Sequence, residues 1–336
     1  MYSTDVVIVG AGPVGLFAIF ECGMMRMKCH VIDTLDMVGG QCSALYPEKP
    51  IYDIPGHPKI SGQDLIDNLQ EQASPFDPVY HLKTQVISLE PLADNRWQVG
   101  LSNGAFIDTK VVIIAAGVGA FGPNRPPLEN LESFEDKSVF YHVKKREDFR
   151  DKRVVIAGGG DSAVDWAISL SEVAEKVMVV HRRAKFRAAP EAEAKLHALA
   201  SEGKLEMIIP YQLDRLEGDQ GVLKTVVVKA LNGQEKHLST DYLLPFFGLS
   251  MNLGPIAYWG LNLDKNHIVI NSTTCETNIA GIYAIGDIAH YPQKLKLILC
   301  GFSEAAQVAR AARALVFPGE VWHFEYSTTQ GVAKIA

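Results

Sequence analysis

Two glycine-rich segments of this chain have the spacing that a loop needs to hold the phosphates of a dinucleotide. The first reads Gly10-Ala11-Gly12-Pro13-Val14-Gly15 and directly follows the apolar run Val6–Val9. Glycines allow a tight turn and a close approach of the backbone to a pyrophosphate, whose charge the N-terminus of a following helix favours. We therefore predict a phosphate site formed by Gly10, Gly12, Pro13, Val14 and Gly15.

An acidic residue stands where such a site needs one. Asp33 follows the second apolar run, Cys29–Ile32, and a carboxylate at the end of that strand accepts hydrogen bonds from a ribose. A carboxylate there also repels a 2′-phosphate, so the pattern indicates FAD or NAD(H) and argues against NADP(H). A glycine-rich turn without a ligand is the alternative, and the strand, helix and acid around this turn argue against it.

The second segment reads Gly158-Gly159-Gly160-Asp161-Ser162-Ala163, with alanine as an accepted variant of the last glycine. Gly158 and His181 are 23 positions apart, as are Gly10 and Asp33, so a histidine followed by arginines replaces the acid. Guanidinium groups pair bidentately with phosphate, which indicates the 2′-phosphate of NADP(H). The predicted NADP(H) residues are Gly158, Gly160, Asp161, Ser162, Ala163, His181, Arg182, Arg183 and Arg187. A solvated charge run or a targeting patch is the alternative for residues 181–187.

The elements that must position these residues form two βαβ units. Each has a strand, a glycine turn, a helix and a second strand, with helices expected up to about Met27 and over 164–174. Shorter strands are expected at 86–89, 97–101, Val111–Ile114 and 282–285, and a final helix at about 302–316. The predicted fold class is therefore α/β, with two Rossmann-like, three-layer dinucleotide-binding domains.

The length of 336 residues allows about two domains. Turn-rich connectors at 122–127 and 245–248 predict that one domain is inserted into the other. We expect a discontinuous domain over 1–120 and 246–318, an inserted domain over 121–245, and a tail over 319–336. The tail contains Trp322, Phe324 and Tyr326, which is unusual for a frayed terminus.

Composition narrows the possible functions. The chain is 47% hydrophobic and 21% charged, which excludes a largely disordered protein, and its net charge of −7 argues against general nucleic-acid binding. Five cysteines without C-x-x-C spacing indicate neither a disulfide framework nor a metal site and fit a reducing cytoplasm. Glycines interrupt the apolar stretch 6–20, so we expect neither a signal peptide nor a membrane helix.

The two glycine motifs, His181-Arg182-Arg183-x-x-Phe186-Arg187-Ala188 and Ala284-Ile285-Gly286-Asp287 resemble those of flavoprotein reductases with two dinucleotide domains. Over roughly 5–315 the chain resembles thioredoxin reductase. That family carries a C-x-x-C dithiol just before the second nucleotide strand, whereas residues 139–145 here contain no cysteine. Disulfide reduction by that route is therefore not expected.

A closer resemblance is to the thioredoxin-reductase-like, bacterial type of ferredoxin–NADP reductase. It rests on residues 39–49, residues 158–166 and Tyr326-Ser327-Thr328, and it covers essentially the whole chain. It implies FAD in the first domain, NADP(H) in the second, and a homodimer. It further implies a FAD site in which Asp33 binds the ribose and the Val86 backbone contacts the adenine. Gln41 and Asp287 would contact the flavin, and Tyr46 would stack on it. Phe121 and Thr328 are at positions that the family also uses for FAD. Tyr326 would stack on the flavin as well, although some relatives carry histidine there.

The implied chemistry belongs to the cofactors, since the sequence contains no recognisable acid–base dyad. Electrons from ferredoxin or flavodoxin, both acidic redox proteins, would fill FAD, and hydride would pass between flavin N5 and nicotinamide C4. The basic residues between 144 and 153 are either a docking face for that partner or a solvated run. Three other functions stay open: a reductase of the thioredoxin type using an unrecognised thiol, an NADPH-dependent quinone or oxygen reductase, and a non-enzymatic nucleotide-sensing module.

Overall fold

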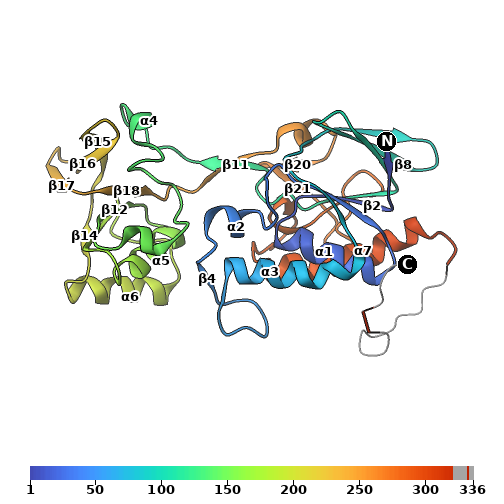
Figure 1. Cartoon of the computed structure of the whole chain (residues 1–336), viewed down its shortest axis with the longest axis horizontal. Helices are drawn as coiled ribbons and strands as arrows, with labels where there is room; N and C mark the ends of the chain where they lie inside the picture. The colour runs from blue at the N-terminus through green and yellow to red at the C-terminus, as the bar shows by residue number, and fades with distance from the viewer. Residues whose placement is uncertain (321–330, 333–336) are drawn as a thin grey trace. The chain divides into compact units, whose positions relative to one another are not determined.

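The chain forms two compact units in a computed structural model that describes residues 1–320 and 331–332, apart from the side chains of Ala120 and Phe121. One unit is Met1–Phe121 together with the chain from Met251 onward, and the other is Gly122–Ser250 (Figure 1). The connecting strands β11 (Ala120–Pro123) and β19 (Leu249–Asn252) pair with each other. The boundaries between the two units lie between residues 121 and 122 and between residues 250 and 251. The sequence predicts these boundaries between 120 and 121 and between 245 and 246.

A parallel five-stranded sheet forms the centre of the first unit. Its strand order is β22-β10-β2-β3-β6, with β22 at Ile282–Ala284, β10 at Val111–Ile114, β2 at Val6–Val9, β3 at Cys29–Ile32 and β6 at Val79–His81. Every residue of the first four is buried, as expected for parallel strands covered on both faces. Because these strands run in one direction, the loops that follow them emerge at one edge of the sheet.

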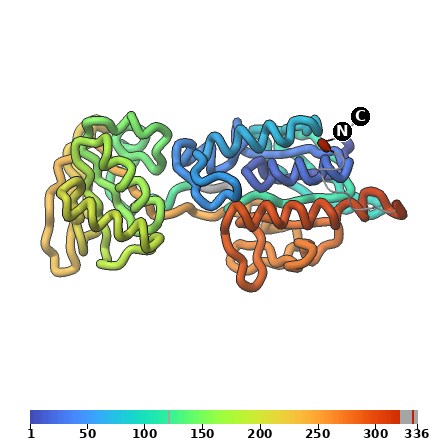
Figure 2. The backbone as a smooth tube through the Cα atoms, turned by 90° about the horizontal axis from the view of Figure 1, so that it is seen from below, coloured from blue at the N-terminus to red at the C-terminus, as the bar shows by residue number. Residues whose placement is uncertain are grey.

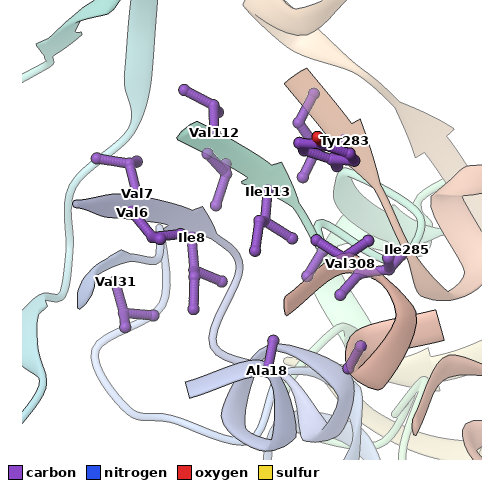
Figure 3. Close-up of a cluster of buried hydrophobic side chains, with 14 of the residues drawn as sticks. Val6, Val7, Ile8, Ala18, Val31, Val112, Ile113, Tyr283, Ile285 and Val308 are labelled. Carbon is purple, nitrogen blue, oxygen red and sulfur yellow. The ribbon is translucent and has the colours of Figure 1, made fainter. Parts of the chain in front are cut away.

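Three helices cover one face of this sheet. Helices α1 (Pro13–Met24), α3 (Gly62–Ala73) and α7 (Ile298–Val316) lie side by side, with α1 in contact with both others (Figure 1, Figure 2). Figure 3 shows Ala18 of α1 and Val308 of α7 beneath the sheet residues Ile8 and Ile113. These contacts fix the helices against the strands that carry the first glycine turn.

The other face is covered by a second sheet of order β1-β9-β8-β7, formed by Tyr2–Ser3, Phe106–Thr109, Arg96–Leu101 and Val86–Leu92. Its buried residues Val99, Leu101 and Ile107 belong to the same core as the central sheet. The remaining elements are short: α2 (Gln41–Leu45), β4 (Pro50–Ile51), β5 (Ile60–Ser61), β20 (Leu263–Asp264), β21 (His267–Val269), β23 (Ala289–His290), and 3₁₀ turns at Ser74–Phe76, Gly254–Tyr258 and Gly286–Ile288.

The second unit is built on a parallel sheet of order β14-β13-β12-β18, formed by Glu206–Ile208, Lys176–Val180, Arg153–Ala157 and Tyr242–Pro245. Its helices are α4 (Leu131–Phe134), a 3₁₀ turn at Arg146–Phe149, α5 (Asp161–Leu170) and α6 (Pro190–Ser201). An antiparallel meander of β15 (Gln212–Asp219), β16 (Val222–Lys229) and β17 (Glu235–Ser239) is inserted between β14 and β18. The predicted α/β class with two Rossmann-like domains is confirmed.

Helix ends differ from the sequence prediction. Helix α1 ends at Met24 instead of about Met27, because Arg26 adopts a left-handed conformation with φ of 61°. The second predicted helix, 164–174, is α5, which begins directly after the glycine turn and ends at Leu170. Among the described residues, no helix combines the length and the apolar character that crossing a bilayer requires.

Candidate functional site

A cavity lies at the carboxyl edge of the central sheet in the first unit. Loops that follow β2, β3, β10 and β22 line it, together with the start of α2 and the start of β7. It brings together nine residues that the sequence predicts for the FAD site: Gly10, Gly12, Pro13, Val14, Asp33, Gln41, Tyr46, Val86 and Asp287. That these residues bind a cofactor stays a prediction, and their convergence from distant parts of the chain supports it.

The three glycines of the first turn have different surroundings. A Cβ atom added to Gly10 would lie 2.4 Å from the Ala115 carbonyl oxygen, and one added to Gly15 would lie 2.0 Å from the Gly10 carbonyl oxygen. A Cβ added to Gly12 would meet nothing within 4 Å, and Gly12 lines the cavity. Gly15 therefore serves close packing within the turn, whereas Gly12 leaves open the space that a pyrophosphate needs.

Asp33 is held against this turn by backbone donors. The N–H of Ala11 donates to its Oδ2 at 2.7 Å, and the N–H of Leu35 donates to its Oδ1 at 2.9 Å. Burial raises the pKa of the Asp33 carboxyl, and these donors act in the opposite direction. The carboxylate is thus fixed beside the glycine turn, where its remaining lone pairs can accept hydrogen bonds from a ribose.

Two of the residues predicted for the flavin side, Gln41 and Tyr46, lie on α2 and directly after it. Gln41, Cys42 and Tyr46 line the cavity, and the Cys42 thiol lies 3.9 Å from the Tyr46 hydroxyl oxygen. Burial raises the pKa of the Cys42 thiol to about 11. The thiolate is the reactive form of cysteine, so at neutral pH Cys42 is not activated as a nucleophile.

A buried ion pair beneath Asp287 escaped the sequence analysis. Glu304 on α7 accepts hydrogen bonds from the Gly286 N–H at 2.7 Å and from the Tyr291 hydroxyl at 2.8 Å, and it also pairs with Lys294. The side chains of Lys294 and Glu304 are each only 4% exposed. The carboxylate thereby ties the loop that carries Asp287 to α7. No local pattern marks this contact in the sequence, since it depends on the packing of the loop against the helix.

The second glycine turn is held by backbone hydrogen bonds from residues that follow β13. We call residues 181–187, which contain Arg182, Arg183 and Arg187, the arginine segment. The Arg187 N–H donates to the Gly159 carbonyl oxygen at 2.6 Å, and the Ala189 N–H donates to Asp161 Oδ1 at 3.1 Å. A Cβ added to Gly159 would lie 2.2 Å from the His181 ring, whereas one added to Gly160 would meet nothing within 4 Å. Gly160 is thus the counterpart of Gly12 in this unit.

His181 and the arginines differ in charge. The His181 ring packs on Phe186 with centroids 4.9 Å apart. Burial lowers the pKa of His181, and the neighbouring arginines lower it further, so the imidazole is neutral at pH 7. The positive charge of this segment comes from exposed Arg182, Arg183, Lys185 and Arg187. Arg182 and Arg183 line a separate pocket within the second unit.

Three predicted positions cannot be placed. The Phe121 side chain, Tyr326 and Thr328 lie outside the described residues. Within the described part of the chain, no group of three or more His, Cys, Asp or Glu side chains could hold a metal ion.

The sequence is similar to those of known proteins over nearly its whole length. The model of the family described as pyridine nucleotide-disulphide oxidoreductase matches residues 4–312. A ferredoxin–NADP reductase of Paramagnetospirillum magneticum is 64% identical over 333 residues, with 99% of each chain covered. A ferredoxin–NADP reductase of Rhodospirillum rubrum is 59% identical over 335 residues, covering 99% of this chain and 97% of the relative.

Solved structures show the same fold. Thioredoxin reductase of Lactococcus lactis, in a form titled the FR conformation, superposes with a TM-score of 0.80 at 25% identity, covering 93% of this chain and 99% of the other. Thioredoxin reductase of T. acidophilum also reaches a TM-score of 0.80, at 23% identity, covering 94% of this chain and 99% of the other. The predicted thioredoxin-reductase-like architecture is confirmed.

The surroundings of Gly12 and Gly160 predict that the same substitution at each glycine abolishes binding at one dinucleotide site and leaves the other intact. Gly12→Val should fold and lose FAD, because its side chain enters space that the protein leaves free, at a φ of −71° that valine tolerates. Gly160→Val should retain FAD and lose NADP(H) affinity for the same reason. FAD content after purification and NADP⁺ titration measure the two losses. Normal FAD content in Gly12→Val would contradict this assignment.

The buried ion pair predicts a large effect on stability. Glu304→Gln should lower the free energy of unfolding by about 3–5 kcal/mol, because it leaves the Lys294 ammonium buried without its carboxylate. Urea unfolding measures the loss. The double variant Glu304→Gln with Lys294→Met is the control and should recover part of it. A Glu304→Gln variant as stable as the parent would show that the pair does not hold this loop.

Proposed function

Since this chain belongs to the pyridine nucleotide-disulphide oxidoreductase family, and within it to the ferredoxin–NADP reductases, we propose that it transfers electrons between ferredoxin and NADP(H) through FAD. The observation that carries the proposal is that the chain has two glycine turns and that the residues at the end of the neighbouring strand have opposite charges. Asp33 closes one turn and Arg182 with Arg183 follow the other. One chain thus carries one site that fits FAD and one that fits NADP(H).

Each unit contributes positioning and electrostatics. FAD supplies the conversion between single electrons and the hydride that passes between flavin N5 and nicotinamide C4. In the first unit the open Gly12 admits the pyrophosphate and Asp33 accepts hydrogen bonds from the adenosine ribose. Tyr46, Gln41 and Asp287 line the cavity. Tyr46 would offer an aromatic face to the flavin, and Gln41 and Asp287 would contact the flavin side. In the second unit Gly160 leaves room for phosphates, while Arg182 and Arg183 favour the 2′-phosphate.

The cysteines argue against disulfide reduction. All five are free, four of them are buried, and Cys300 is partly exposed. Burial raises the pKa of Cys42, the cysteine that lines the cavity, so no activated thiol meets the predicted flavin position. Electrons therefore have no thiol relay to follow. That they leave toward a one-electron carrier is supported by the relatives named ferredoxin–NADP reductase.

We extend the proposal to the partner, the assembly and the location of the protein. Ferredoxin or flavodoxin, as an acidic carrier, would bind a basic face, and the protein would be a cytoplasmic homodimer. Within the basic stretch 144–153, Arg146 pairs with Glu172, Arg150 with Glu147, and Arg153 with Asp241. These charges are largely neutralised, so any docking role for this stretch falls mainly to Lys144, Lys145 and Lys152.

The nucleotide assignment predicts the effect of neutralising Arg182 and Arg183 together. Charge-assisted hydrogen bonds contribute about 1.5–3 kcal/mol each. The variant Arg182→Gln with Arg183→Gln should therefore raise KM for NADPH by tens-fold or more and leave KM for NADH nearly unchanged. Anaerobic reduction of the flavin, followed by its visible absorbance, measures both. Equal losses with the two nucleotides would mean that these arginines hold the fold and not the phosphate.

The tail, residues 319–336, is proposed to cover the flavin, with Tyr326 stacked on the ring and Thr328 beside it. Such stacking contributes only about 0.5–1.5 kcal/mol beyond the buried area, so nicotinamide can displace the ring during turnover. Deleting residues 325–336 should leave FAD bound, change the flavin absorption spectrum and alter the rate of hydride transfer. Parental spectra and parental NADPH kinetics in the truncated enzyme would refute this role of the tail.

A further inference from the structure

A pocket of the second unit lies between the arginine segment and the inserted meander, and residues of both line it. It is lined by Arg182, Arg183, Pro210, Tyr211, Gln212, Lys229 and Leu231. Only the two arginines belong to the segment that the sequence pattern marks as a phosphate site. The remaining residues come from the entry into β15, from the end of β16 and from the turn that follows it.

Backbone hydrogen bonds explain why the meander reaches this place. The His181 N–H donates to the Ile208 carbonyl oxygen at 3.3 Å, and the Tyr211 N–H donates to the His181 carbonyl oxygen at 3.1 Å. The end of β13 and the beginning of β15 are therefore held side by side. Since ligands of such folds bind at the carboxyl ends of the parallel strands, the meander begins at the nucleotide edge.

The register of the meander places a third cation in this pocket. Gln212 of β15 pairs with Lys229 of β16, and Lys229 pairs with Glu235 of β17. Directly opposed residues project from the same face of a sheet, so these three side chains share one face. Two of them, Gln212 and Lys229, line the pocket with the arginines.

The charges of this group are not balanced within the pocket. Among the described residues, neither Arg182 nor Arg183 has a carboxylate partner. Lys229 Nζ lies 3.4 Å from Glu235 Oε1, but Glu235 also accepts a hydrogen bond from Arg215 at 3.1 Å. Glu235 therefore keeps a partner when Lys229 turns toward an anion. Three cations around one pocket favour a multiply charged anion.

We infer that Lys229 is a specificity-determining residue that binds the 2′-phosphate of NADP(H) together with Arg182 and Arg183. This inference rests on the NADP(H) site of the proposed function and extends it to the meander. The guanidinium groups offer bidentate hydrogen bonds, and the lysine ammonium adds a point charge on the other side of the phosphate. An adenosine without the 2′-phosphate makes no use of Lys229.

Binding of 2′,5′-ADP and of 5′-AMP to the FAD-loaded enzyme, measured by calorimetry, tests the inference without any redox partner. Lys229→Met should weaken 2′,5′-ADP binding about tenfold and leave 5′-AMP binding unchanged. Lys229→Arg should retain most of the affinity, because it keeps the charge. Lys224→Met is the matched control, since Lys224 is an exposed lysine of the same strand that does not line the pocket.

The unchanged 5′-AMP affinity shows that a variant is folded at this site. Full 2′,5′-ADP affinity in Lys229→Met, with a large loss in the Arg182→Gln and Arg183→Gln double variant, would overturn the role of Lys229 and leave the proposed function intact. Equal affinity of the parent enzyme for 2′,5′-ADP and 5′-AMP would overturn both this inference and the NADP(H) assignment.

Discussion

The structure depends on one constraint: the turn that follows a parallel strand must leave space beside its backbone. In both units a glycine, Gly12 or Gly160, leaves that space free of side-chain atoms. In the first unit, the Ala11 N–H donates to Asp33 Oδ2 at 2.7 Å, which locks the turn after β2 to the end of β3. That bond fixes the carboxylate beside Gly12, the one glycine of the turn whose side-chain position is free. The helices under the sheet and the second sheet above it hold these loops in place.

The second unit repeats this geometry with a different charge. Gly160 is open as Gly12 is, but the strand-end position holds neutral His181, which packs on Gly159 and Phe186. Arginines follow it, so we propose that the edge of the sheet that accepts a ribose in one unit attracts a phosphate in the other. In the proposed function, a few side chains on a common backbone thus distinguish two similar dinucleotides. The loop at Asp287 is tied to α7 by a different contact, in which Glu304, paired with Lys294, accepts a hydrogen bond from the Gly286 N–H.

Strands were easier to predict from the sequence than helix ends or tertiary contacts. The sequence predicts Val6–Val9, Cys29–Ile32 and Val111–Ile114 to the residue, since buried parallel strands are continuous apolar runs between turn residues. The last helix was expected from about Phe302, yet α7 begins at Ile298 and contains Gly301, where a Cβ would lie 2.3 Å from Val14 Cγ2. A glycine inside a helix for close packing looks like a helix boundary in the sequence. The roles of Glu304 and Lys229 depend on contacts between distant segments, which no local pattern encodes.

We propose that electrons pass between NADP(H) and a one-electron carrier through FAD, without a thiol relay. The most direct measurement compares NADPH oxidation by the FAD-loaded enzyme with ferredoxin, with a small disulfide and with a quinone as acceptors, under anaerobic conditions. We expect sustained turnover with ferredoxin and no disulfide reduction above the enzyme-free rate. Disulfide turnover, or rapid quinone reduction with none of ferredoxin, would contradict it.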